Sequence, residues 1–154
     1  MPLIEIKTFI DADIQVCFDL SRDIDFHKMS MVDSGEKAIA GKTSGLIALG
    51  EWVTWEAKHF GITQKLTSKI TQFDPPYYFV DEMVSGAFKS FKHEHRFQIE
   101  NDGTVMVDTF YFQSPFGIFG KIANVLFLKH YMTNLLVTRN TFLKEKAEEL
   151  SYNQ

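Results

Sequence analysis

The sequence predicts a single α+β domain in which a curved antiparallel sheet of about six to seven strands wraps around a long C-terminal helix. Three observations predict this fold: two short helical segments follow the first strand, strand-like segments with tight turns fill the middle, and an amphipathic helical segment closes the chain. The length of 154 residues fits one domain over residues 1–154, because domains commonly have roughly 100–200 residues.

The first quarter of the chain combines strands with short helices. The opening segment is rich in β-branched residues that alternate along the chain, which indicates a strand. Asp11 and Asp13 then offer N-caps for a helix, because their side chains accept hydrogen bonds from free backbone N–H groups. The expected elements are a strand over 3–10, helices over 14–20 and 24–29, and a strand over 36–40.

Long strands with tight turns follow from residue 52 onward. Asp74-Pro75-Pro76 interrupts the series, because proline cannot donate a hydrogen bond to a strand ladder. Asn101-Asp102-Gly103 is a strong hairpin signal, since these residue types tolerate positive φ. Strands are expected over 52–60, 62–73, 77–84, 88–99 and 104–113. Such a succession of hairpins predicts an antiparallel meander with one buried face.

A long helix is expected after the strands stop at Ser114-Pro115. It begins at Gly117 or Gly120 and runs to about Leu150, which makes it roughly 50 Å long at about 1.5 Å per residue. Apolar residues at three- and four-residue spacing form one stripe along it. The stripe comprises Ile118, Ile122, Val125, Met132, Leu136, Leu143 and Leu150. One such helix is the economical cover for the apolar face of the sheet.

Composition and charge exclude several classes of protein. The net charge of −4 argues against a nucleic-acid partner, because phosphate binding needs clustered Lys and Arg. The most apolar run, residues 122–128, is far shorter than the roughly 20 residues of a membrane span, so no integral membrane span is expected. The N-terminus lacks the pattern of a signal peptide, and Cys17 is the sole cysteine. A cytoplasmic location is therefore expected.

Polar side chains interrupt the apolar faces of two neighbouring strands. One strand face carries Phe91, His93, His95, Phe97 and Ile99, and the next carries Met106, Asp108, Phe110 and Phe112. An apolar strand face is normally the buried one, so Asp108 and both imidazoles are expected to point inward. A buried carboxylate needs a partner, and the candidates are His93, His95 and Arg139.

These inward polar groups have more than one interpretation. They form a structural network that fixes the strand register, or they orient a ligand carbonyl or hydroxyl, or His93 or His95 acts with Asp108 in acid–base catalysis. Two histidines two residues apart share a strand face and would bind a metal if His59 or Asp108 joined them. We expect a hydrogen-bonded pair instead, with no metal and no cofactor.

The apolar faces also predict the lining of a ligand pocket. Trp55 shares a side with Val53 and Ala57 and is expected to face the interior, whereas Trp52 faces the opposite side. Arg139 lies at the edge of the helical stripe and either reaches a buried anion or extends into water. The candidate ligand-binding residues are Trp55, Phe91, His93, His95, Phe97, Asp108, Phe110, Met132, Leu136 and Arg139.

Residues 45–142 resemble the SRPBCC superfamily, which includes START-like, Bet v 1-like and polyketide cyclase/dehydrase-like proteins, and the order of elements is the helix-grip plan. The resembling segments are 50–61 and 79–88, together with Phe91, His93, His95, Phe97, Asp108, 115–117 and 139–140. The resemblance implies a deep pocket between sheet and terminal helix that takes lipids, polyketides or other apolar molecules. It implies no particular catalytic residue.

Three functional hypotheses follow. The first is a protein that binds a hydrophobic small molecule in this pocket. The second is a cyclase or dehydratase that uses His93, His95 and Asp108, and a hydrogen-bonded His/Asp pair open to the cavity would favour it. The third is a protein–protein interaction module of co-chaperone type, which an open groove with a large exposed apolar patch would favour.

Overall fold

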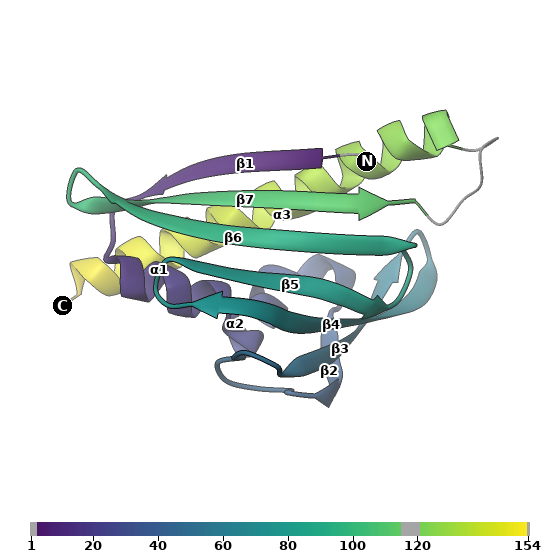
Figure 1. Cartoon of the computed structure of the whole chain (residues 1–154), viewed down its shortest axis with the longest axis horizontal. Coiled ribbons are helices and arrows are strands. Elements are labelled where there is room, and N and C mark those ends of the chain that lie inside the picture. The colour runs from purple at the N-terminus through teal and green to yellow at the C-terminus, as the bar shows by residue number, and fades with distance from the viewer. Residues whose placement is uncertain (1–2, 115–120, 154) are drawn as a thin grey trace.

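The computed structural model describes residues 3–114 and 121–153, with side chains in the last helix described from Leu126 onward. It contains one seven-stranded antiparallel sheet, two short helices after the first strand and a long C-terminal helix, which confirms the predicted α+β fold (Figure 1). The strands are β1 (Leu3–Ile10), β2 (Lys37–Gly41), β3 (Trp52–His59), β4 (Ile62–Asp74), β5 (Tyr78–Ser85), β6 (Ser90–Glu100) and β7 (Gly103–Gln113). The helices are α1 (Ile14–Ser21), α2 (Ile24–Ser30), the 3₁₀ turn η1 (Val32–Ser34) and α3 (Lys121–Tyr152).

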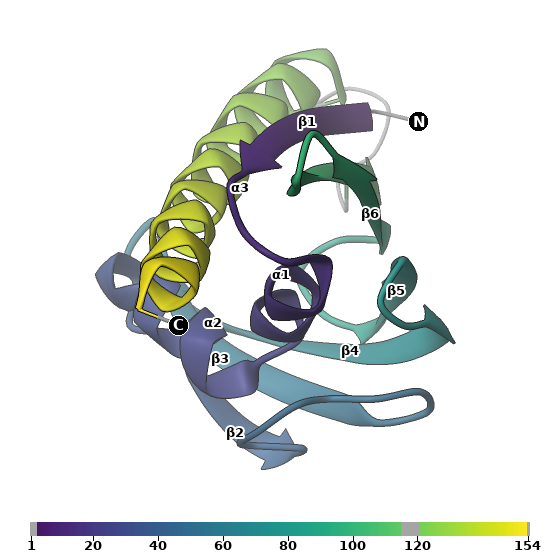
Figure 2. The same ribbon diagram turned by 90° about the vertical axis from the view of Figure 1, so that its left-hand side faces the viewer.

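The sheet order is β1-β7-β6-β5-β4-β3-β2, so the first strand pairs with the last. Helices α1 and α2 separate β1 from β2 in the chain and lead from one edge of the sheet to the other. Figure 2 shows the strands curving around the space that α1 and α3 occupy. This arrangement leaves the concave face of the sheet turned towards α3.

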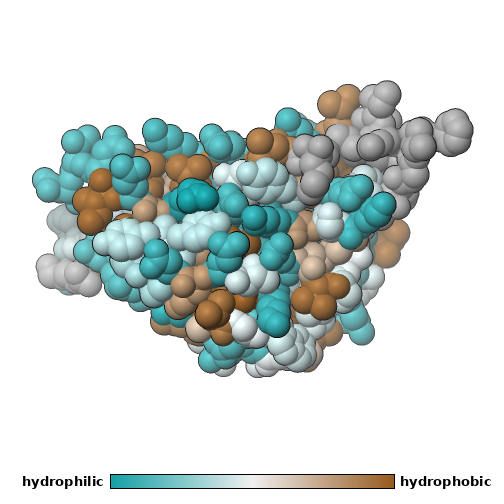
Figure 3. All heavy atoms as spheres, viewed as in Figure 1, coloured by the Kyte–Doolittle hydropathy of each residue, from teal (hydrophilic) through white to brown (hydrophobic). Residues whose placement is uncertain are grey.

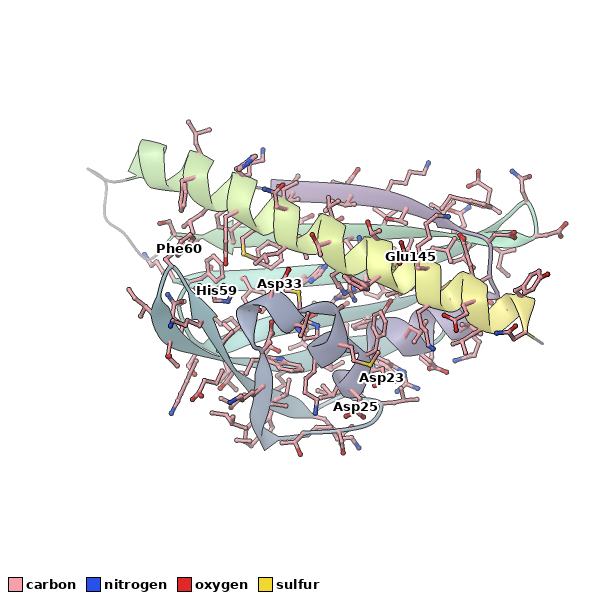
Figure 4. All side chains as sticks on the ribbon, turned by 180° about the vertical axis from the view of Figure 1, so that it is seen from behind. Asp23, Asp25, Asp33, His59, Phe60 and Glu145 are labelled. Atoms are coloured by element: carbon pink, nitrogen blue, oxygen red, sulfur yellow. The ribbon has the colours of Figure 1, made fainter. Side chains whose placement is uncertain are left out.

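Side-chain caps set the starts of both short helices. The carboxylate of Asp13 accepts a hydrogen bond from the backbone N–H of Gln15 at 2.8 Å, as its position in the sequence predicts. Asp23, which lies at the start of α2 in Figure 4, accepts from the N–H groups of Asp25 and Phe26. The chain therefore turns sharply between α1 and α2, and both helices pack across the open end of the curved sheet (Figure 2).

The hairpin predicted at Asn101-Asp102-Gly103 joins β6 to β7. Asn101 and Asp102 have φ values of 50° and 65°, the left-handed region that these residue types tolerate. The turn places His95 directly opposite Asp108 in the β6–β7 pairing. The long central strands consequently carry the inward polar residues in register.

Helix α3 buries only part of its expected stripe. Leu136 and Leu143 are buried and Met132 is half-buried, but Leu150 is 37% exposed and Ala147 takes the buried position near the C-terminus. The predicted start at Gly117 or Gly120 and the side chains of Ile118, Ile122 and Val125 lie outside the described residues. Among the helices that the structure describes, none combines the length and the apolar character that a membrane crossing requires.

Two apolar clusters fill the space between the sheet and the helices. One lies beneath α1, where Phe18 packs against Phe73, Phe79 and Phe97 with ring centroids 5.4–5.6 Å apart. The other lies beneath the middle of α3 and includes Ile4, Phe91, Phe110, Phe112 and Leu136. The buried polar residues of β6 and β7 belong to neither cluster.

One inward prediction for β6 is wrong. Ile99 alternates with the buried residues of this strand but is 61% exposed. It lies beside the β6–β7 turn, opposite Thr104. On the side of the molecule seen in Figure 3, apolar side chains are scattered among hydrophilic ones.

Candidate binding cavity and its polar cluster

A cavity of about 810 Å³ lies between the concave face of the sheet and α3. Its walls come from strands β3 to β7, from the end of α1, from α2 and from α3 between Phe127 and Arg139. Most of the lining side chains are aliphatic or aromatic, because the inward positions of these strands are apolar. The sequence-predicted space between sheet and terminal helix is therefore present.

Eight of the ten predicted ligand-binding residues line the cavity. They are Trp55, Phe91, His93, His95, Phe110, Met132, Leu136 and Arg139. Trp55 is buried on the inner side of β3, whereas Trp52 is 43% exposed on the other side, as alternation predicts. The two remaining candidates, Phe97 and Asp108, are not among the lining residues.

Phe97 and Asp108 were expected in the lining of the cavity, but other residues separate both from it. Phe97 points inward, but Phe18 of α1 lies 5.4 Å from its ring and fills the space in front of it. Asp108 is fully buried behind His93 and His95. Alternation along a strand indicates which side a residue faces but not what covers it.

Asp108 is the centre of a buried polar network. Its Oδ1 accepts a hydrogen bond from Nε2 of His93 at 2.9 Å and from the guanidinium of Arg139 at 3.2 Å. Its Oδ2 accepts from the side-chain amide of Asn140 at 2.7 Å. Nδ1 of His95 lies 3.1 Å from Oδ1 without the alignment of a hydrogen bond. All three predicted partners of Asp108 are thus beside it, and Asn140 is a fourth that the sequence did not reveal.

Arg139 is buried, so the interpretation that it extends into water is wrong. Only 5% of the residue is exposed, and its guanidinium also donates to the carbonyl oxygen of Ser21 at 3.1 Å. Through these contacts Arg139 links α3 to α1 and to Asp108. One edge of Arg139 also lines the cavity.

Asp81 on β5 is the site residue that the sequence reasoning missed. Its Oδ2 lies 2.8 Å from Nε2 of His95 and 3.9 Å from Nδ1 of His93, and it lines the cavity. The alternation of residues along β5 could have indicated its inward position, because Asp81 shares the inner side of the strand with Phe79 and Met83. Asp81 and Asp108 therefore flank the two imidazoles, whose centroids are 3.8 Å apart and whose planes are tilted by 31°.

The environment shifts the pKa of each group in this cluster. Burial alone would raise the pKa of Asp108, but the adjacent His93 and His95 and the charge of Arg139 hold it well below its usual range. The pKa of Asp81 is also lowered, because His95 and His93 outweigh the effect of burial. Burial and the charge of His95 lower the pKa of His93. The pKa of His95 is raised, because its two carboxylate neighbours outweigh burial.

The end of the cavity beside the first half of α3 is built from aromatic side chains. His59 and Phe60 lie at the tip of the β3–β4 hairpin, next to α3 in Figure 4. The ring of Phe60 is 4.5 Å from Tyr131 and 5.3 Å from Phe127, and His59 shares a hydrogen bond with the Tyr131 hydroxyl. His59 is thus engaged with α3 and does not join His93 and His95.

A second polar pair, also missed from the sequence, lies on the α2 side of the cavity. His27 of α2 is hydrogen-bonded to Glu36 at 2.8 Å, and its ring lies 4.4 Å from that of Trp55. All three residues line the cavity. Hydrogen-bonded polar groups are therefore present at two separated positions in a mainly apolar wall.

Neither a family model nor a curated protein matches this sequence. Solved structures do match, and they share the fold described above over nearly the whole chain. TTHA0849 from Thermus thermophilus has a TM-score of 0.78 and 18% identity, covering 97% of this chain and 99% of its own. Ginseng major latex-like protein 151 from Panax ginseng has a TM-score of 0.68 and 13% identity, covering 95% and 97%.

CalU16 from Micromonospora echinospora is similar over 98% of this chain and 82% of its own, with a TM-score of 0.60 and 15% identity. At these identities the likeness shows the fold alone. It confirms the helix-grip fold that the resemblance to the SRPBCC superfamily implied. The binding properties of this chain must be argued from its own residues.

Proposed function

We propose that this protein binds a hydrophobic small molecule, such as a lipid or a polyketide, in the cavity between sheet and α3. The observation that carries the proposal is the cavity of about 810 Å³ with its mainly apolar walls. Pockets for small molecules commonly have volumes of roughly 300–1,000 Å³ and a few convergent polar groups. The ligand class implied by the resemblance to the SRPBCC superfamily agrees with this lining.

The polar groups of the wall suit a ligand that carries an oxygen function. Asp81, His93 and His95 lie together on the sheet side, and His27 lies on the α2 side. A hydroxyl or carbonyl placed against either group gains a hydrogen bond that the apolar walls do not supply. A cytoplasmic location belongs to the same proposal, and the single, unpaired Cys17 supports it.

The two tryptophans provide a direct test, because one lines the cavity and the other lies outside it. In a Trp52→Phe variant, Trp55 is the only tryptophan, and dibrominated stearic acid should quench its emission saturably, since bromine quenches indole at close contact. The matched Trp55→Phe variant retains only Trp52, whose emission should be unaffected. Fluorescence titration of both variants, with unbrominated stearic acid as a blank, measures the difference.

Equal quenching of both tryptophans would indicate binding at the surface and would contradict the proposal. So would unchanged Trp55 emission over the whole range in which the acid stays monomeric. The comparison depends only on which face of β3 each ring occupies.

An enzyme on the same scaffold is the second candidate, and one observation favours it. Nε2 of His95 contacts Asp81 at 2.8 Å, and both residues line the cavity. An imidazole beside a carboxylate is a workable general base, so a cyclase or dehydratase reaction is compatible with this wall. Of the two carboxylates beside these histidines, Asp81 lines the cavity, whereas Asp108 is enclosed behind the rings. A carrier releases its ligand unaltered, whereas an enzyme changes the ligand's structure during incubation.

A further inference from the structure

Three donor atoms converge at one point of the cavity wall. Asp81 of β5 and His93 and His95 of β6 each offer one ligand atom, and these atoms all lie within 4.8 Å of one another. We propose that these three residues bind a divalent first-row transition metal ion such as Zn²⁺ or Fe²⁺. Two imidazoles and one carboxylate are ligand types that these ions accept.

The strand pairing brings the three ligands together. Asp81 lies directly opposite His93 in the β5–β6 pairing, and His95 lies two residues further along the same face of β6. The closest contact is diagonal, from Oδ2 of Asp81 to Nε2 of His95 at 2.8 Å, while Nδ1 of His93 is 3.9 Å from the same oxygen. The three metal ligands thus lie on two strands that are hydrogen-bonded to each other.

The observed separations suit a metal ion with small side-chain adjustments. A tetrahedral ion about 2.0–2.2 Å from each ligand atom separates those atoms by roughly 3.3–3.6 Å. The distances of 2.8 and 3.9 Å lie on either side of that range. Both distances end at Oδ2 of Asp81, whose side chain is 20% exposed, so rotation of that side chain changes both of them.

Asp108 orients both imidazoles for this role. It faces Nε2 of His93 at 2.9 Å and Nδ1 of His95 at 3.1 Å, the ring nitrogens turned away from Asp81. A carboxylate only accepts hydrogen bonds, so Nε2 of His93 carries a hydrogen, and in the neutral ring the lone pair of its Nδ1 is on the side of Asp81. His95 is hydrogen-bonded to Asp81 through Nε2, and its Nδ1 beside Asp108 is not aligned for a hydrogen bond. A metal bound to Nε2 of His95 would displace that hydrogen, and Nδ1 would then carry one beside Asp108. Metal-binding histidines typically donate their second ring N–H to a carboxylate in this way.

The charges of the cluster favour a cation at the same point. Asp108 is paired with the buried guanidinium of Arg139. The ion pairs that the structure records for Asp81 are with the two histidines. With both rings neutral, the two carboxylates and the guanidinium leave one net negative charge in the cluster, which a cation beside Asp81 would balance.

The remaining coordination positions would open into the cavity, because Asp81, His93 and His95 all line it. Three protein ligands with an open position are typical of catalytic metal sites, whereas structural sites are closed. A metal here would bind an oxygen of the cavity ligand directly. Metal binding requires no apolar ligand. The metal site can therefore be absent while the cavity binds an apolar molecule, and it can be present while the cavity binds none.

The test uses the full chain, stripped with a chelator and dialysed. Titration with Co²⁺, followed by its visible absorption, and with Zn²⁺, followed by calorimetry, should show one equivalent bound. Asp81→Asn and His95→Gln should each weaken binding by at least about tenfold. The matched control is His130→Gln, which alters an exposed histidine on α3 and should leave the affinity unchanged.

Absence of one-to-one binding to the wild-type chain would overturn the proposal. Affinity that is unaltered in Asp81→Asn would do the same, because the metal would then be bound elsewhere. If the substitutions impair folding, the site can still be tested on the wild-type chain alone. In NMR spectra of the wild-type chain, Zn²⁺ should shift the ring signals of His93 and His95 and leave those of His130 unchanged, and the opposite pattern would refute the site.

Discussion

Replacing Asp108 with alanine should destabilise the protein more than any surface substitution, by about 3–5 kcal/mol. Asp108 is fully buried and holds Arg139, Asn140 and His93. Its removal leaves the Arg139 guanidinium as a buried charge without its carboxylate partner. Because domains are stable by only about 5–15 kcal/mol, a large share of the free energy of unfolding is lost. Denaturant unfolding of the wild type and the variant measures it.

The β6–β7 hairpin offers a matched control for this experiment. Asp102→Asn also removes a carboxylate, but at an exposed turn position where asparagine tolerates the positive φ, and should alter stability by less than about 0.5 kcal/mol. Asp108→Asn keeps the shape of the side chain, so its loss of stability should lie between those of Asp108→Ala and Asp102→Asn. Equal stability of Asp108→Ala and Asp102→Asn would show that the buried network contributes little.

Filling the cavity should abolish ligand binding while preserving the fold. Ala57 and Ser68 lie on the inner sides of β3 and β4 and line the cavity. The double variant Ala57→Phe/Ser68→Phe places two phenyl rings in the space that the ligand would use. We expect the affinity for brominated stearic acid to fall by at least about tenfold, which corresponds to about 1.4 kcal/mol. The Trp55 emission of a Trp52→Phe background reports it.

A ring added on the outer face separates this effect from added hydrophobicity. Lys69 follows Ser68 on β4 and is exposed, so Lys69→Phe points away from the cavity. That variant should bind as the parent protein does. Weakened binding in Lys69→Phe, or undiminished binding in the filled variant with its fold intact, would mean that the ligand binds elsewhere.

Local patterns were enough to predict the order of elements and the side that most strand residues face. Alternation placed Trp55, His93, His95 and Asp108 inward, and each is buried. It did not reveal depth along a strand. Ile99 alternates with buried residues but is 61% exposed, because which residues cover a position depends on contacts distant in sequence.

The polar cluster was only half predictable for the same reason. Asp81 shares its strand face with Phe79 and Met83, but its place beside His95 depends on the pairing of β5 with β6, which no local pattern fixes. Sequence patterns therefore suggested His59 or Asp108 as a third metal ligand. His59 proved to be bonded to Tyr131, and Asp108 lies on the far side of the imidazoles from Asp81.

Native mass spectrometry tests the central claim, that the cavity holds an apolar small molecule, most directly. The wild-type chain is purified without detergent, incubated with a lipid extract of the expression host and compared with the Ala57→Phe/Ser68→Phe variant. We predict a defined added mass on the wild type that is released on denaturation and is missing from the filled variant. A wild-type spectrum with the polypeptide mass alone, or the same added mass on both proteins, would contradict the claim.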